Sequence, residues 1–174
     1  LALIFFRKEI KFPKNISVQL FRGFFLFLST VFFLYAISII SLAQALTLAF
    51  VSPIIVTILS IFYLKEKVGI HRWSAVIIGF IGVLIIIRPG FLEINFASIS
   101  AIGAGTAYAF YIIYTRKLSF IDSPVVTLLF TGVVGCIIIS IILPYYWTNI
   151  DLRQLLLLIL LASIGALAHF LIIL

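Results

Sequence analysis

The most constraining feature of the sequence is the length of its uncharged, apolar runs. Forty-two consecutive residues, from Gly23 to Leu64, contain no Asp, Glu, Lys or Arg, and similar runs cover 73–87, 94–115, 123–150 and 154–174. Of the 174 residues, 65% are hydrophobic and only 10% are charged. Soluble domains are about half apolar and about a quarter charged. The sequence therefore predicts an integral membrane protein.

The lengths of these runs predict how often the chain crosses the membrane. A helix of about 20 residues spans the hydrocarbon core of a bilayer. The run from Gly23 to Leu64 can hold two helices, with a turn near Ser38–Gln44, and each of the other four runs can hold one. Leu1–Phe6 is expected to be the tail of a further helix. Because the chain has no Met and begins and ends in apolar runs, we expect a fragment of a longer, all-α polytopic helical bundle.

The basic residues are shared unequally between the gaps that separate the predicted spans. The gaps at 7–22, 65–72 and 116–122 hold ten of the twelve Lys and Arg residues, whereas the alternate gaps hold only Arg88 and Arg153. Positively charged loops stay on the cytoplasmic side, so the three basic gaps are predicted to be cytoplasmic. Membrane topology thus accounts for the net charge of +7, and no nucleic-acid partner is expected.

The spans contain almost no ionisable residues. All five acidic residues fall in gaps, and His169 is the one intramembrane His. This argues against an ion channel or a carboxylate-driven proton pump. One His and the single Cys136 do not make a metal site, so no metal, cofactor or catalytic residue is expected. Two alternatives to transport stay open: a structural or regulatory subunit, and a lipid-modifying enzyme, which would need clustered acid and base groups.

Two features inside the spans point to a cavity. In the fourth span, small residues followed by Tyr108 and Tyr111 recur at steps of three and four, so they share one helix face. The two tyrosine rings have two possible roles: they can stack on a flat ligand, or they can belong to an interfacial aromatic belt. In the second span, Pro53 has no N–H, so the carbonyl of Ala49 loses its helical donor. This predicts a kink, and transporters place interrupted helices at binding sites.

Two ionisable residues have competing interpretations. His169 lies on a stripe of small residues and is expected to face protein, either as a neutral His bonded to a neighbouring helix or as a ligand-facing group that titrates near neutral pH. Glu66 lies in a basic loop, and we interpret it as the partner of Lys65 or Lys67 in an interfacial ion pair.

Short motifs follow one another in a specific order along both halves of the chain. They are Arg22-Gly23, Ser52-Pro53, Leu64-Lys65-Glu66-Lys67-Val68, Gly79-Phe80-Ile81-Gly82, Arg88-Pro89-Gly90, Gly103-Ala104-Gly105-Thr106-Ala107-Tyr108-Ala109 and Gly165-Ala166-Leu167-Ala168-His169. In this order and spacing the chain resembles the EamA-type transporters of the drug/metabolite transporter superfamily. The resemblance covers nearly the whole chain.

The resemblance implies a ten-helix protein made of two five-helix halves of opposite orientation. Residues 1–90 would be the end of the first repeat (the tail of one helix plus three helices), and 91–174 the start of the second (three helices). The opposite directions that charge assigns to the spans after Arg22 and Arg153 agree with inverted repeats.

The resemblance also implies an activity and a location. The activity is secondary transport of a small metabolite by alternating access, in a bacterial inner membrane, and the substrate class is an amino acid, a nucleotide-like compound, a vitamin or S-adenosylmethionine. The expected partners are the substrate and the lipid bilayer, and a homodimer is left open. Substrate identity, direction and coupling ion are not fixed.

The resemblance, together with Pro53 and the helix face that carries Tyr108 and Tyr111, predicts a cavity built from the first, second, fourth and sixth complete spans. The family has no universal motif that marks essential residues, so the candidates are chosen from these spans. They are Thr30, Tyr35, Gln44, Ser52, Pro53, Tyr108, Tyr111 and His169.

Overall fold

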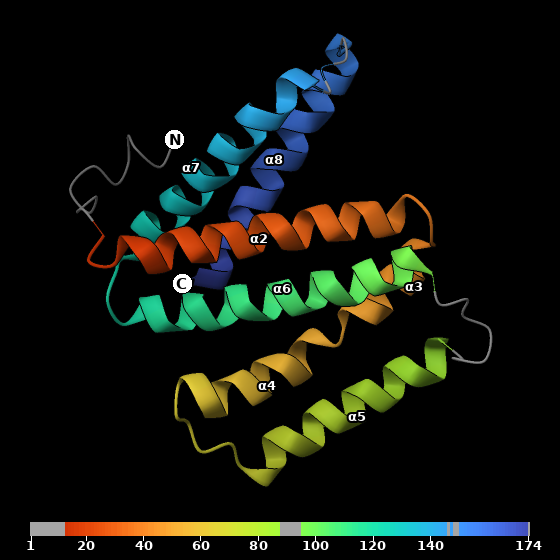
Figure 1. Cartoon of the computed structure of the whole chain (residues 1–174), viewed down its shortest axis with the longest axis vertical. Helices are drawn as coiled ribbons and strands as arrows, with labels where there is room; N and C mark the ends of the chain where they lie inside the picture. The colour runs from red at the N-terminus through yellow and green to blue at the C-terminus, as the bar shows by residue number, and fades with distance from the viewer. Residues whose placement is uncertain (1–12, 88–94, 146, 148–149, 174) are drawn as a thin grey trace. The chain divides into compact units, whose positions relative to one another are not determined.

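The computed structural model describes residues 13–87, 95–145, 147 and 150–173, and this part of the chain consists of helices joined by short loops and turns, with no strand. The predicted all-α fold class is confirmed. The helices, labelled in Figure 1, are α2 (Ile16–Ile37), α3 (Leu42–Ala49), α4 (Ser52–Tyr63), α5 (Ile70–Ile87), α6 (Phe96–Ser119), α7 (Pro124–Ile142) and α8 (Leu152–Ile173), with a short 3-10 helix, η2 (Leu143–Tyr145).

These helices match the six complete spans that the apolar runs predict. Among the described residues, four segments are long and apolar enough to cross a membrane: Ile16–Ile37, Leu42–Tyr63, Phe96–Leu118 and Pro124–Tyr145. Shorter apolar stretches lie in α5 and α8. Large apolar side chains of α8 are exposed, as expected of a surface in contact with lipid. The chain is therefore an integral membrane protein, and Leu1–Phe6 lies outside the described residues.

Short polar residues set where the helices begin. A side-chain oxygen of the residue before the helix accepts a backbone N–H of the first turn in α2, α3, α6, α7 and α8. At α3, Ser41 and Gln44 form a reciprocal capping box. The turn predicted near Ser38–Gln44 is confirmed, because α2 ends at Ile37 and α3 begins at Leu42.

The start of the first complete span differs from the prediction. Helix α2 begins at Ile16, not at Gly23, so Arg22 lies inside the helix, where its side chain is fully buried. The prediction was wrong because it placed every charged residue outside the spans. The guanidinium of Arg22 can lie inside the helix because it donates hydrogen bonds to groups of α7.

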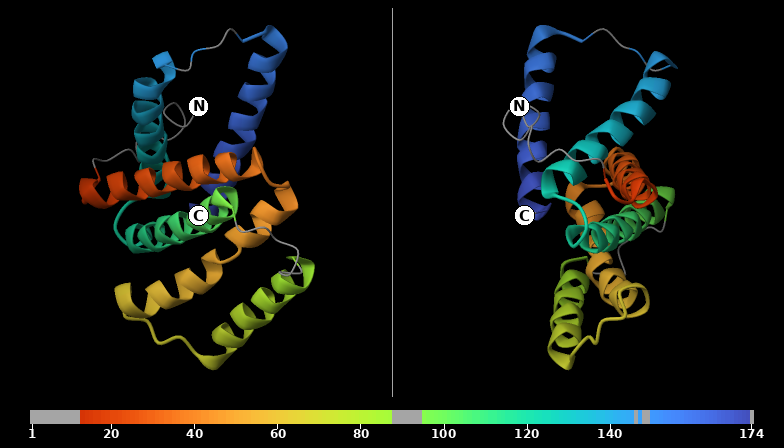
Figure 2. Two further views of the ribbon diagram at one scale, coloured as in Figure 1. Left: turned by 45° about the vertical axis from the view of Figure 1, so that its right-hand side comes forward. Right: turned by 90° about the vertical axis from the view of Figure 1, so that its left-hand side faces the viewer.

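The described residues form two compact units. In one, the first turns of α2, up to Gly23, pack against α7, which lies beside α8. In the other, which runs from Phe24 to Lys117, α2 and α6 lie side by side in opposite directions, and α5 packs against α3 and α4 (Figures 1 and 2). Its core is built on the fully buried Ala36, Ala45 and Ala101, whose small side chains allow close helix approach.

Candidate functional site

Helix α6 is the scaffold of the candidate site. Its small residues Ala97, Ala101 and Ala104 are at most 2% exposed, so the face predicted from their spacing is buried. Two hydrogen bonds join this helix to α2: the Ser29 hydroxyl donates to the Ala104 carbonyl at 2.9 Å, and the Ser100 hydroxyl donates to the Phe32 carbonyl at 2.9 Å. Helices α2 and α6 are thereby held at a fixed distance beside the site.

The second span is interrupted next to α6. Helix α3 ends at Ala49 and α4 begins at Ser52, with Pro53 in its first turn, where a missing N–H does least harm. The N–H of Phe50 donates to the Leu46 carbonyl at 3.0 Å, which closes α3. The interruption predicted from Pro53 is thus present, with α3 and α4 as separate helices.

A glycine on α6 makes room for this interruption. A Cβ added at Gly105 would overlap the carbonyl oxygen of Ala49 and would lie 3.0 Å from the carbonyl carbon and the Cα of the same residue. Because backbone cannot give way as a flexible side chain can, residue 105 must be glycine for α3 to approach α6 this closely. The carbonyl of Ala49 therefore points at Gly105.

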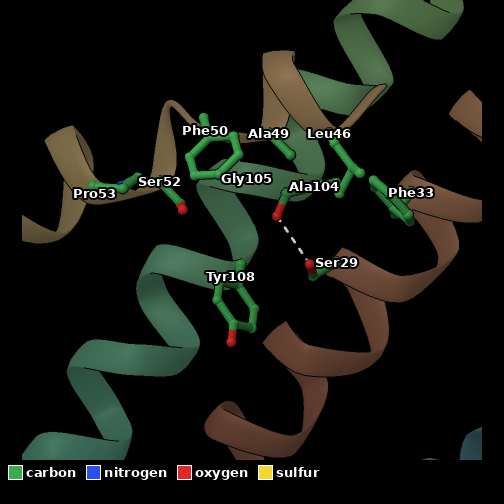
Figure 3. Close-up of a pocket in the computed structure, with 10 residues that line it drawn as sticks. All are labelled: Ser29, Phe33, Leu46, Ala49, Phe50, Ser52, Pro53, Ala104, Gly105 and Tyr108. Carbon is green, nitrogen blue, oxygen red and sulfur yellow. Dashed lines mark hydrogen bonds between the residues drawn. The ribbon is translucent and has the colours of Figure 1, made fainter. Parts of the chain in front are cut away.

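A pocket of about 330 Å³ lies between α2, the α3–α4 interruption and α6. The ten residues that line it are mostly small or aromatic, and none is charged (Figure 3). They are Ser29, Phe33, Leu46, Ala49, Phe50, Ser52, Pro53, Ala104, Gly105 and Tyr108. We call this space the α3–α6 pocket. Its size falls in the range of small-molecule sites, and so does its mainly apolar wall with a few polar groups.

The ring of Tyr108 is supported from its own helix. Tyr108 and Tyr111 are stacked, with ring centroids 5.5 Å apart and an interplanar angle of 30°. Tyr111 is fully buried, so the partner of this stack is fixed. Tyr111 therefore supports the Tyr108 ring, which presents a flat surface at the pocket wall.

The structure brings three of the predicted site residues together. Ser52, Pro53 and Tyr108 line the α3–α6 pocket. Tyr111 does not line it, but it stacks on Tyr108.

The other candidates lie elsewhere. Thr30 is exposed and donates to the Leu26 carbonyl of its own helix, Tyr35 is 48% exposed, and Gln44 belongs to the capping box of α3. His169 lies in α8, but its side chain is outside the described residues. The expected contributions of these residues and of the sixth span to a cavity stay predictions.

Sequence reasoning missed several pocket residues. On α2 it selected Thr30, whereas Ser29 and Phe33, one turn apart, face the pocket. The tight packing between α6 and α3 had a signal in the small residues Ala104 and Gly105, because stripes of small residues mark close helix contacts.

A second group of polar residues joins α2 to α7 in the other unit. We call it the Arg22 cluster; it consists of Gln19, Arg22, Asp122, Thr127 and Thr131. Arg22 and Gln19 are fully buried. Arg22 donates to the Thr127 carbonyl at 2.9 Å and to the Thr131 hydroxyl, and the Gln19 amide donates to Asp122 at 2.9 Å and to the Thr127 hydroxyl at 3.3 Å. These bonds hold the first turns of α2 against α7.

The loop between α4 and α5 is tied to the end of α6. Glu66 forms ion pairs with Arg116 at 2.9 Å and with Arg72 at 3.6 Å. The prediction that its partner is Lys65 or Lys67 was wrong. Lys65 instead adopts a left-handed conformation (φ 54°), which ends α4 and turns the chain so that Glu66 reaches the more distant arginines.

The sequence is similar to known proteins, over half of its length in one comparison and over nearly all of it in another. The EamA-like transporter family model matches residues 1–88, half of the sequence. The chain belongs to the EamA-like transporter family. The family and the names of the chain's relatives point to transport and not to an enzyme. No solved structure matches the chain.

Curated relatives of the chain are named as transporters. The S-adenosylmethionine uptake transporter of Rickettsia bellii is 27% identical over 97% of this chain and 58% of its own length. The riboflavin transporter of Vibrio cholerae is 43% identical over 47% of this chain and 27% of its own length. The S-adenosylmethionine uptake transporter of Rickettsia conorii is 25% identical, over 97% and 57%. The two Rickettsia transporters match nearly all of this chain, but the chain spans only about half of their length.

Proposed function

We propose that the protein is a secondary transporter that moves small metabolites across a bacterial inner membrane by alternating access. Membership of the EamA-like transporter family supports transport, and the named activities of its relatives support a small organic substrate. Inverted repeats that meet near residue 90 would supply the two orientations that alternating access needs. The opposite directions assigned to α2 and α8 by the basic gaps agree with that arrangement.

We propose further that the α3–α6 pocket is part of the substrate site. The observation that carries this proposal is the composition of the pocket wall, which combines the ring of Phe50, the supported ring of Tyr108 and two serines, with no charged lining residue. Such a wall suits a flat, uncharged ring system better than a carboxylate or phosphate. Riboflavin and S-adenosylmethionine, the compounds in the relatives' names, both carry a heteroaromatic ring.

Uptake into proteoliposomes that contain the whole protein tests both proposals. The panel holds riboflavin, S-adenosylmethionine, adenosine and several amino acids. We expect uptake of at least one ring-bearing compound, and we expect Tyr108→Ala to reduce that uptake at least about tenfold through loss of aromatic packing. Tyr145→Ala is the matched control, because Tyr145 is 85% exposed and lies outside the pocket, in η2.

The outcomes separate the two proposals. Protein that is correctly inserted and transports none of the panel would contradict a metabolite transporter of this class. Uptake that is equal in the wild type, Tyr108→Ala and Tyr145→Ala would support transport but remove the α3–α6 pocket from the site.

A further inference from the structure

Basic residues that are distant in the sequence meet where the segment from α4 to α5 reaches the last turn of α6. We call them the loop–α6 patch; they are Lys65, Lys67, Arg72, Arg116 and Lys117. Glu66 joins the two parts, because its carboxylate pairs with Arg116 at 2.9 Å and with Arg72 at 3.6 Å. Glu66 is the one acidic residue in the stretches 60–75 and 105–120. The patch therefore keeps a net positive charge.

The two lysines of the segment between α4 and α5 carry charge that no carboxylate of the described residues balances. Lys65 and Lys67 are both exposed, and the carboxylate between them in the sequence is held by two arginines instead. An ammonium group offers three hydrogen-bond donors. The two lysine side chains are thus available to an anion from outside the protein.

The surroundings of the patch are those of a membrane surface. The Nζ of Lys117 lies 5.3 Å from the centre of the Tyr63 ring, and the Tyr63 hydroxyl donates to the Tyr114 hydroxyl at 3.4 Å. Tyrosines are typical of the level at which a span leaves the hydrocarbon. Phe62 and Ile70, at the end of α4 and the start of α5, are 77% and 76% exposed. The cations therefore border apolar surface that can contact acyl chains.

This combination restricts the anion that the patch fits. Lys and Arg form charge-assisted hydrogen bonds to phosphate oxygens. Basic sites at the cytoplasmic ends of membrane helices bind anionic lipid headgroups, and the gaps that hold the patch are the ones whose charge predicts a cytoplasmic location. A soluble phosphate would use the cations alone, whereas a phospholipid would also use the exposed Phe62 and Ile70.

We propose that the loop–α6 patch binds the headgroup of an anionic phospholipid, with Lys65 and Lys67 at its phosphate and with acyl chains beside Phe62 and Ile70. The lipid then links the segment between α4 and α5 to α6, in addition to the pair between Glu66 and α6, and stabilises the folded protein. This does not depend on the substrate role of the α3–α6 pocket, because no residue of the patch is among those that line the pocket.

Thermal unfolding of the whole protein, delipidated in dodecyl maltoside, tests the proposal. The protein is titrated with dioleoylphosphatidylglycerol, with dioleoylphosphatidylcholine or with inorganic phosphate. The patch variant combines Lys65→Gln with Lys67→Gln. The matched control combines Lys14→Gln with Arg153→Gln, which removes the same charge from exposed residues outside the patch.

A ligand that binds only the folded state raises the unfolding temperature. We expect saturating phosphatidylglycerol to raise that of the wild type by about 5 °C, and phosphatidylcholine and inorganic phosphate to leave it unchanged. The patch variant should lose most of the phosphatidylglycerol shift, and the control variant should keep it.

Each contrary result overturns a different part of the proposal. Equal shifts with the two lipids would contradict recognition of an anionic headgroup, and this needs only the wild type, so it is decisive even if the patch variant does not fold. An equal shift with inorganic phosphate would assign the patch to a soluble anion. A phosphatidylglycerol shift that is the same in the patch and control variants would place the lipid elsewhere. Because none of these measurements involves transport, they stand apart from success or failure of the proposed function.

Discussion

The α3–α6 pocket and the Arg22 cluster use polar groups in opposite ways. In the cluster, the fully buried guanidinium of Arg22 and the fully buried amide of Gln19 donate hydrogen bonds to α7 and to Asp122, whereas Oε1 of Gln19 is buried without a hydrogen-bond partner among the described residues. In the pocket, the wall is mainly apolar and aromatic, and its few polar side chains are uncharged. Both regions lie in helices whose sequences are those of apolar membrane spans.

This difference indicates that the Arg22 cluster has a structural role and that the α3–α6 pocket has a binding role. Buried polar groups that satisfy one another fix helices in one arrangement, because breaking any bond leaves a buried group unpaired. A wall of rings and small residues leaves a space that a flat molecule can fill. Changes in the cluster should therefore act on stability, and changes in the pocket on binding.

The largest expected effect is that of Arg22→Ala. The substitution removes a buried side chain that donates to Thr127 and Thr131, so it creates a cavity and loses charge-assisted bonds. We expect a loss of about 3 kcal/mol in the free energy of unfolding. Thermal unfolding in detergent and abundance in the membrane measure this. An unfolding temperature equal to that of the wild type would show that the cluster is not a structural joint.

The next effect is that of Gly105→Ala. The new Cβ would overlap the Ala49 carbonyl and push α3 from α6, at a cost of about 1 to 3 kcal/mol for overpacking. We expect ligand binding to fall more than stability does, because the displaced backbone lines the pocket.

Gly135→Ala on α7 is the matched control for this substitution. A Cβ there meets no atom within 4 Å. Equal binding by Gly105→Ala and Gly135→Ala would contradict the need for close approach of α3 to α6.

The smallest effect should come from Glu66→Gln, which tests a polar contact that is neither buried nor at the pocket. Its partner Arg116 is 40% exposed, so water screens the pair. Surface ion pairs contribute about 0 to 1 kcal/mol, and we expect a change of at most about 0.5 kcal/mol in unfolding free energy and normal uptake. Urea unfolding and transport assays measure this. A loss as large as that of Arg22→Ala would mean that the loop between α4 and α5 holds the fold together.

The sequence predicted what depends on neighbouring residues and missed what depends on distant ones. Apolar length marked the spans, and Pro53 marked the α3–α4 interruption, because a missing N–H acts within one turn. Arg22 was assigned to a loop because its partners Thr127 and Thr131 lie more than 100 residues away and were not foreseeable. Ser29 was missed for Thr30 because a choice between adjacent residues depends on how α2 is rotated, which packing against α6 decides.

Protection of a cysteine in the pocket by a transported compound tests the central claim most directly. In a Cys136→Ser background of the whole protein, Ser52→Cys places a thiol at the pocket wall, and Ser74→Cys places one on the exposed start of α5. The rate of alkylation by N-ethylmaleimide is measured with and without saturating riboflavin or S-adenosylmethionine, whichever the protein transports. We predict that the compound slows alkylation at position 52 and leaves position 74 unchanged. Equal rates at position 52 with and without the compound would contradict the assignment of the α3–α6 pocket as the substrate site.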